Sequence, residues 1–203
     1  MNNRNIIFAT GNEGKMDEIR AIMGDFLIKY GFNLMSLKEA GIDADIVEDG
    51  ETFEANAIIK AKAIAEMTDS IVLADDSGLE VDYMDKAPGV YSARFLGSDT
   101  PYSIKNQHII DKLEDAKEDE RTARFVCVIA CAFPDGEIIT TRGTIEGIIA
   151  HEIAGVNGFG FDPIFYVPEF GCTTAELTPE KKNEISHRGR ALTKMMGELE
   201  KVL

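Results

Sequence analysis

The sequence predicts an α/β fold with a mixed, twisted sheet flanked by helices. Short apolar runs alternate with helical patterns in the first half of the chain, as they do around parallel strands. In the second half, two apolar runs joined by a tight turn indicate a hairpin. The chain has 203 residues, 44% of them hydrophobic, which is enough for one domain with a substantial core or for two lobes that share a sheet.

The first half of the chain contains two strand-and-helix patterns. Residues 6–9 form a short apolar run that turns at 10–12 into a helical pattern. A second amphipathic helix is expected from about Thr52 to Met67, and it leads into another apolar run. We expect this second strand to end at Asp75, where residues favoured in turns begin.

The second half begins with an irregular stretch and a helix, which is expected from Thr100 to about Ala116. Residues 124–133 are apolar on both faces, which predicts a buried strand, and the turn at 134–136 leads into a second strand over about 137–146. Residues 155–171 are rich in Gly, Phe and Pro and predict a structured loop. A helix after Ser186 closes the chain.

Charge and cysteine content exclude some classes of protein. There are 36 acidic and 21 basic residues, a formal net charge of −15, which disfavours nucleic-acid binding but allows a small anionic ligand in a locally basic cleft. Three cysteines without a Cys-x-x-Cys pair indicate a reducing compartment. Residues 1–5 lead into only four apolar residues, and no apolar run approaches the roughly 20 residues of a membrane span. We therefore expect a cytoplasmic protein.

Two adjacent carboxylates, Asp75 and Asp76, follow an apolar run and precede Ser77 and Gly78. Hard cations such as Mg²⁺ take oxygen ligands from one or two carboxylates and leave the other positions to water and phosphate oxygens. The pattern is therefore typical of a metal site. A polar turn is the alternative, because Asp, Ser and Gly are all favoured in turns.

Residues 10–15, from Thr10 to Lys15, connect the first strand to the first helix. Backbone N–H groups at the helix start and the lysine could both face a phosphate, and a capped turn with a surface lysine is the alternative. A Walker A loop needs Gly and Ser or Thr where this chain has Ala9 and Met16. Methionine offers Mg²⁺ no hard oxygen, so an ordinary P-loop NTPase is not predicted.

Asn56 and Lys60 are four residues apart on the second predicted helix and share one face, with Glu48 in the acidic run before it. Solvated polar side chains are the simpler explanation. If the start of this helix faces Asp75 and Asp76, however, Glu48 becomes a third oxygen ligand.

Two later segments could contact a nucleotide. Residues 159–163 read Phe-Gly-Phe-Asp-Pro, a composition that lets a planar base approach the backbone, although aromatic side chains are more often part of a core. Lys181, Lys182, His187 and Arg188 are expected to form a local basic patch suited to phosphate or carbonyl groups.

With these groups in this order, the chain resembles the non-standard purine nucleoside triphosphate pyrophosphatases, the XTP/dITP diphosphatase or inosine triphosphate pyrophosphatase family. The similarity extends nearly from end to end. It is carried by Thr10-Gly11-Asn12 with Lys15, Thr52-Phe53 with Asn56, Ala57 and Lys60, Leu73 to Leu79, Ala87 to Arg94, Gly158 to Pro163, and Lys182 with Ile185 to Gly189. Each segment alone is a weak signal, whereas all of them in register are very specific.

The resemblance implies Mg²⁺-dependent hydrolysis of ITP, dITP and XTP to the monophosphate and pyrophosphate, with Mn²⁺ as the alternative metal. It implies an elongated single domain over residues 1–203, with two lobes, an active-site cleft between them, and a homodimer. The expected partner is a nucleotide substrate, with no nucleic acid and no membrane.

The resemblance also implies roles for individual residues. Asp76 would be a metal ligand and the proton acceptor, with Glu48 and Asp75 as further metal ligands. The residues assigned to substrate binding are Thr10, Gly11, Asn12, Glu13, Gly14, Lys15, Asn56, Lys60, Ser77, Phe159, Gly160, Phe161, Asp162, Lys182, His187 and Arg188. The family often has tyrosine where this chain has Phe161, so a role for that hydroxyl is absent here.

Inosine and xanthosine present an acceptor carbonyl at position 6, so fixed donors would select them over adenosine, and His187 and Arg188 are the candidate donors. Two alternatives remain, a Maf-like pyrophosphatase for modified pyrimidine nucleotides and a catalytically silent purine-nucleotide sensor. The loop at 159–162 argues against the first, and the intact Asp76 and Lys15 argue against the second. The sequence leaves open how GTP is rejected. It also leaves open whether Asp75 or Glu48 completes the metal shell.

Overall fold

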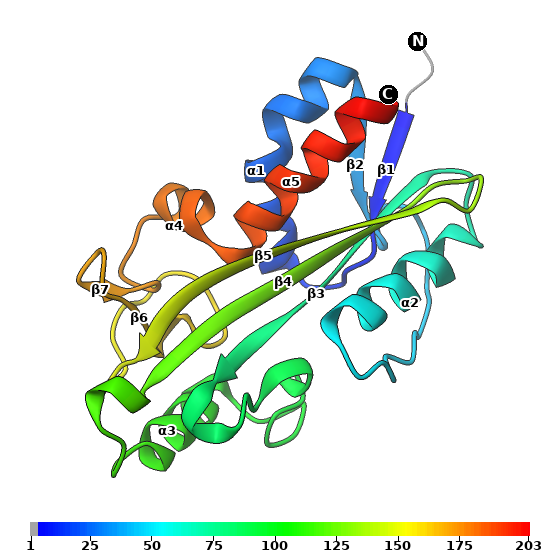
Figure 1. The fold of residues 1–203 in the computed structure, drawn as a ribbon. Helices are drawn as coiled ribbons and strands as arrows, with labels where there is room; N and C mark the ends of the chain where they lie inside the picture. The colour runs from blue at the N-terminus through cyan, green and yellow to red at the C-terminus, as the bar shows by residue number, and fades with distance from the viewer. Residues whose placement is uncertain (1–3) are drawn as a thin grey trace. The chain divides into compact units, whose positions relative to one another are not determined.

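The computed structural model describes residues 4–203, which contain a mixed seven-stranded sheet in the order β2-β1-β3-β4-β5-β6-β7 (Figure 1). The described residues form two compact units. Unit 1 contains the residues up to Asp76, together with Cys127–Gly143 and His187–Leu203, and unit 2 contains Ser77–Val126 and Thr144–Ser186. The prediction of an α/β fold with a mixed sheet is confirmed.

The strands and helices are as follows. The strands are β1 (Arg4–Phe8), β2 (Phe32–Ser36), β3 (Ile71–Val81), β4 (Thr122–Ala132), β5 (Ile138–Ile149), β6 (Phe165–Val167) and β7 (Cys172–Thr173). The helices are α1 (Glu13–Tyr30), α2 (Phe53–Ala65), α3 (Tyr102–Lys112), α4 (Pro179–Ile185) and α5 (His187–Val202), with short 3₁₀ turns such as η4 (Asp162–Ile164). The sequence patterns did not anticipate β2, α4 or the short strands β6 and β7.

In unit 1, β1 pairs in parallel with both β2 and β3. Helices α1 and α5 lie side by side on one face of these strands, and α2 lies on the other face (Figure 1). The core beneath α1 and α5 is built from β1, β3, β4 and both helices. Cys127 and Cys131 are fully buried in this core, where they serve as small apolar residues.

The helices of unit 1 begin where the sequence supplies caps. The Asn12 side chain accepts a hydrogen bond from the backbone N–H of Lys15, and Thr52 does the same for Ala55. Helix α1 ends at Gly31, whose φ of 68° lies in the left-handed region that glycine adopts without strain. These caps set the direction in which each helix leaves the sheet.

Unit 2 has its own apolar core, formed by α3, the ends of β3, β4 and β5, and the segment around β6. Arg121 is 1% exposed, and its guanidinium donates to the carbonyls of Leu113, Ile149 and Ala150, which joins the end of α3 to the end of β5. Buried guanidinium groups require such partners. Helix α3 is shorter at both ends than the predicted helix over 100–116.

Strand β3 corrects one prediction. The strand does not end at Asp75 but continues to Val81, and Leu79 and Val81 are fully buried. Because β4 is its neighbour along the sheet, the backbone after Asp76 has a strand to pair with. This pairing overrides the local turn preference of the Asp-Ser-Gly segment.

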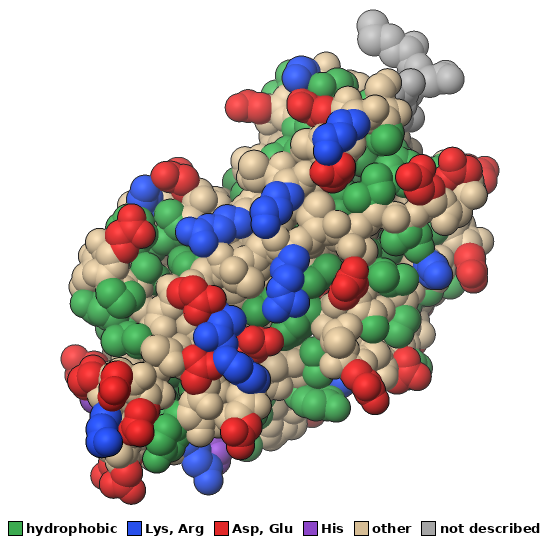
Figure 2. All heavy atoms as spheres, viewed as in Figure 1, with side chains coloured by type: hydrophobic (Ala, Val, Ile, Leu, Met, Phe, Trp, Pro, Cys, Tyr) green, Lys and Arg blue, Asp and Glu red, His purple; other side chains and the backbone are tan. Residues whose placement is uncertain are grey.

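On the face drawn in Figure 2, acidic side chains are spread over the surface with Lys and Arg among them, as a net charge of −15 leads one to expect. Within residues 4–203, no helix is both long and apolar enough to cross a membrane.

Candidate active site

The turn at 10–15 and the adjacent carboxylates lie at the same end of the sheet. In the parallel register of β1 and β3, Phe8 is opposite Leu73, and the N–H of Ala9 donates to the Leu73 carbonyl at 2.7 Å. Asp75 and Asp76 follow within three residues. Ligands of α/β proteins bind outside the carboxyl ends of parallel strands, so this end of unit 1 is the candidate site.

Asp75 is 1% exposed and faces α1 and α5. Its Oδ2 is 2.9 Å from Lys15 Nζ on α1 and 3.3 Å from Arg188 Nη2 on α5. Arg188, which is also buried, pairs with Glu18 on α1. Burial by itself would raise the pKa of Asp75, but the charges of Lys15, Arg188 and Lys60 outweigh it and hold this pKa well below its usual range. Asp75 is therefore an anion between two cations.

Asp76 faces the opposite way, because successive residues of a strand point to opposite faces. Its Oδ2 accepts a hydrogen bond from Asn56 Nδ2 on α2 at 3.1 Å. Lys60 Nζ, also on α2, lies 2.9 Å from Glu48 Oε2 and 4.0 Å from Asp76 Oδ1. The explanation of Asn56 as a solvated polar residue is wrong, since it is 1% exposed.

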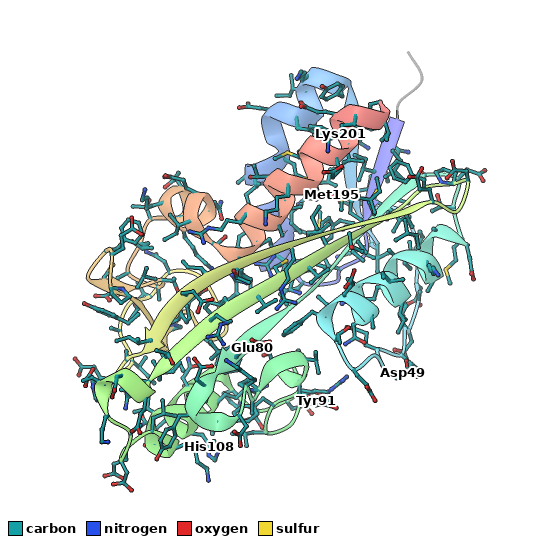
Figure 3. All side chains as sticks on the ribbon, viewed as in Figure 1. Asp49, Glu80, Tyr91, His108, Met195 and Lys201 are labelled. Carbon is teal, nitrogen blue, oxygen red and sulfur yellow. The ribbon has the colours of Figure 1, made fainter. Side chains whose placement is uncertain are left out.

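Asn56 also fixes the loop before α2, which Asp49 marks in Figure 3. Its Oδ1 accepts from the Gly50 N–H at 2.8 Å, so both ends of the amide are bonded and its orientation is set. A Cβ on Gly50 would lie 2.7 Å from this oxygen, so the position requires glycine. The loop thereby places the half-buried Glu48 beside Lys60.

The environment of Asp76 prepares it to accept a proton. Burial raises its pKa to about 6, the negative charge of Glu48 acts in the same direction, and Lys60 and Asn56 oppose both. A general base is most effective when its pKa lies near the working pH. Asp76 has this property, whereas Asp75 does not.

The turn over 10–15 is a capped turn, and its backbone is also open to a phosphate, so features of both interpretations of the sequence are present. It is capped, since the Asn12 N–H donates to Thr10 Oγ1 at 3.2 Å and the Asn12 side chain caps α1. Gly11, Asn12 and Glu13 are exposed, so the backbone at the helix start is open to a ligand. Lys15 is not a surface lysine, because its side chain is 19% exposed and pairs with Asp75.

The predicted metal ligands are not gathered into one set. Among residues 4–203, no group of three or more His, Cys, Asp or Glu side chains is arranged to hold a metal ion. Asp75 is paired with two cations on one face of β3, while Glu48 and Asp76 face a single ammonium on the other face. The carboxylates suited to a shared cation are therefore Glu48 and Asp76.

In unit 2, Asp162 organises the loop at 158–162. Its Oδ2 accepts from the Phe159 N–H at 2.8 Å and from Lys182 Nζ at 2.6 Å, and Thr174 Oγ1 donates to its Oδ1 at 2.9 Å. Asp162 and Lys182 are both nearly buried. Lys182 Nζ also lies 4.8 Å from the centroid of the Phe159 ring.

The two aromatic residues of this loop differ. Phe161 is 4% exposed, with its ring edge-on to Tyr102 at a centroid distance of 5.2 Å and near Phe95 at 6.5 Å. Phe159 is half-buried. Phe159 is therefore the more exposed of the two rings. Ser77, in β3, is also half-buried.

The side chains of the expected basic patch are mostly withdrawn from solvent. Lys182, His187 and Arg188 are buried, and Lys181 pairs with Glu184. Sequence reasoning also missed Glu18 and Gly50. Glu18 lies three residues after Lys15 on α1, so the helical spacing of the two could have indicated a shared face. Gly50 carried no signal of its own, because its role depends on Asn56 of α2.

Comparisons with known proteins agree with this site. A sequence model of the Ham1 family matches residues 6–198. A dITP/XTP pyrophosphatase of Clostridium perfringens is 46% identical over 206 residues, covering 98% of this chain and 99% of that protein. One from Desulforamulus reducens is 50% identical over 191 residues, covering 94% and 93%.

Solved structures give the same result. A HAM1 protein from Coxiella burnetii has a TM-score of 0.87 at 40% identity, covering 98% of this chain and 99% of that one. The Ham1 protein of Staphylococcus aureus has a TM-score of 0.86 at 39% identity, covering 98% and 100%. The resemblance inferred from the sequence motifs is confirmed, and so is the prediction that the chain belongs to a family of enzymes: it is a member of the Ham1 family.

Proposed function

We propose that this protein hydrolyses the non-standard purine nucleoside triphosphates ITP, dITP and XTP to the nucleoside monophosphate and pyrophosphate. The observation that carries the proposal is the environment of Asp76, a largely buried carboxylate with a pKa raised to about 6. The names of the relatives support the substrate class, since they are dITP/XTP pyrophosphatases.

In the proposed reaction, water attacks the α-phosphorus and the bond to the β-phosphate breaks, so that pyrophosphate leaves. Asp76 takes the proton of the attacking water. Asn56 holds the carboxylate by one oxygen and leaves the other facing Lys60. The exposed start of α1 and Lys15 are suited to the triphosphate.

We propose that Asp76 and Glu48 bind Mg²⁺, with Mn²⁺ as the alternative. The donor set fits, because both carboxylates already face one cation, the ammonium of Lys60. Mg²⁺ is commonly held by one or two carboxylates together with water and substrate phosphates, so a full protein cage is not required. When bound, the ion would neutralise charge on the phosphates. Asp75 instead holds Lys15 and Arg188 in place.

We propose that the 158–162 loop and Lys182 contact the base, with the half-buried Phe159 as the stacking surface. His187 and Arg188 remain the candidate donors to the 6-carbonyl. The Arg188 guanidinium is paired with Glu18 and Asp75, which fix its orientation. Any hydrogen bond that it donates to the 6-carbonyl would come from that fixed orientation.

The test is pyrophosphate release from ITP, GTP, ATP and dUTP, with Mg²⁺ and with excess chelator. Fast, metal-dependent release from ITP, with ATP much slower, is the expected result. The Asp76→Asn variant is the matched control, since it keeps the shape of the side chain and loses the proton acceptor.

The same assay separates the alternatives. Binding of ITP without any release would indicate a nucleotide sensor. A preference for dUTP would indicate a pyrimidine-directed pyrophosphatase and would contradict the argument from the 6-carbonyl. Release that persists undiminished in chelator would contradict the metal assignment.

We also propose that the protein acts in the cytoplasm as a homodimer. Apolar side chains of unit 2 that are exposed in the single chain, Tyr83, Tyr91, Leu96 and Ile104, support a partner surface. Sedimentation equilibrium of the wild type and of Ile104→Lys tests the dimer, and a wild-type monomer at all concentrations would contradict it.

A further inference from the structure

Helix α3, which His108 marks in Figure 3, contributes no residue to the nucleotide and metal sites proposed above, yet it holds the 158–162 loop. Asn106 is 2% exposed, and its Nδ2 donates to the carbonyl oxygen of Gly160 at 3.1 Å. Among residues 4–203, Asn106 is the residue seen to donate a hydrogen bond to the Gly160 carbonyl. The loop is therefore held at one end by Asp162 and in its middle by Asn106.

Gly160 also lies beside another residue of α3, Tyr102. Gly160 has a φ of +69°, a conformation that side chains rarely adopt. A Cβ at this position would lie 3.6 Å from the ring of Tyr102, which is one helical turn before Asn106. The same Tyr102 ring packs edge-on against Phe161. Tyr102 and Asn106 thus present one face of α3 to two consecutive residues of the loop.

The amide of Asn106 is only half satisfied. Its Oδ1 is buried and has no hydrogen-bond partner among the described residues, and a flipped amide would instead place two acceptors 3.1 Å apart. An unsatisfied buried acceptor is destabilising. An apolar residue would avoid that cost but would leave the Gly160 carbonyl without its donor, so what asparagine contributes at this position is its hydrogen bond to the loop.

We infer that Asn106 is a positioning residue for base recognition, which acts by setting the Gly160 peptide and, with it, the orientation of Phe159. This inference rests on the proposed function, in which the 158–162 loop contacts the base. Because the loop recognises the base and Asp76 performs the chemistry, loss of Asn106 should weaken recognition more than turnover.

The test compares Asn106→Leu with Gln107→Leu by steady-state kinetics on ITP and on ATP, together with the melting temperature. Leucine has a similar shape and removes both the donor and the unsatisfied acceptor, and because the Gly160 carbonyl then loses its donor, the melting temperature should fall modestly. The KM for ITP should rise about tenfold, equivalent to about 1.4 kcal/mol. The KM for ATP should rise with it, because an aromatic ring stacks on either purine. The value of kcat should change less than about threefold.

Gln107 is the matched control, because it is the next residue of α3, is exposed, and donates from its side-chain amide to Asp111 of its own helix. Gln107→Leu should leave both KM values unchanged. If Asn106→Leu does not fold, Asn106→Ser replaces it with the same expectations.

Two results would overturn the inference: an unchanged KM for ITP, or a fall in kcat at least as large as the rise in KM, which would indicate a general structural role. If the wild type releases no pyrophosphate, the proposed function fails first, and calorimetric titration with ITP still tests Asn106. Weaker ITP binding by Asn106→Leu would then uphold the positioning role, and equal binding would exclude it.

Discussion

The two faces of β3 carry neighbouring aspartates in opposite electrostatic environments. On the face toward α1 and α5, Asp75 lies between Lys15 and Arg188, and its pKa is held well below the usual range. On the face toward α2, Asp76 has a hydrogen bond from Asn56 and a more distant ammonium, and its pKa rises to about 6. Both carboxylates are largely buried.

The difference teaches that burial alone does not decide the role of a carboxylate. Desolvation acts on both groups in the same direction, toward the protonated form. Two close cations on one face overcome it, while on the other face the nearest cation is shared with Glu48. The first arrangement suits a structural anion, and the second suits a proton acceptor.

The largest expected effect is on the Asp76 face. Asp76→Asn should lower kcat for ITP by about 10²–10⁴-fold, the usual contribution of a general base, because the amide cannot accept the proton of water. Steady-state kinetics and a melting curve check this. An active and folded Asn variant would remove Asp76 from the proton-acceptor role.

The matching change on the other face should act on stability. Asp75→Asn leaves the buried Arg188 and the partly buried Lys15 without their shared carboxylate, which should cost about 3–5 kcal/mol in the free energy of unfolding. Urea denaturation at pH 7.5 measures it. If Asp75→Asn loses activity while its unfolding curve matches the wild type, the division between a structural and a chemical aspartate is wrong.

The pH dependence sharpens the comparison. In the metal-free protein, Asp76 keeps its proton up to about pH 6, whereas in the unfolded chain it loses it near pH 3.8. Its raised pKa therefore favours the folded state below this window, and the contribution is lost as pH rises through about 6. Comparing the free energy of unfolding of wild type and Asp76→Asn at pH 5 and pH 7 tests the sign. A difference that does not change between these pH values would contradict it.

Asn56 should affect the pKa of Asp76, the proposed proton acceptor. Its hydrogen bond lowers the pKa of Asp76, so Asn56→Ala should move the acid limb of the kcat/KM profile to higher pH. A profile for ITP from pH 5 to 9 measures the shift. A limb that moves to lower pH, or that stays in place, would mean that the hydrogen bond does not stabilise the carboxylate.

The smallest effect on stability is expected at an exposed ion pair that involves neither Asp75 nor Asp76. Arg20 Nη2 lies 2.8 Å from Glu39 Oε1, and both side chains are more than 40% exposed. Arg20→Ala should leave the free energy of unfolding nearly unchanged, because water screens the pair. A loss as large as that of Asp75→Asn would show that burial is not what separates the two pairs.

The sequence by itself determined the fold class, most elements and the residues that carry the family resemblance. Periodic apolar residues set the helices and strands, Asn12 and Thr52 set helix starts, and the turn at 134–136 set the hairpin. These signals are readable because each depends on hydrogen bonds and side chains only a few residues apart.

Only the tertiary structure decided that Asp75 and Asp76 have different environments and different roles. Pairing with its neighbour carries β3 through Asp75 and Asp76, and the alternation of a strand then sends them to opposite faces. The charges that set their pKa values come from Lys15, Lys60 and Arg188, which lie far apart in the sequence. Strand pairing and charge burial depend on such distant residues, so no local pattern could have shown them.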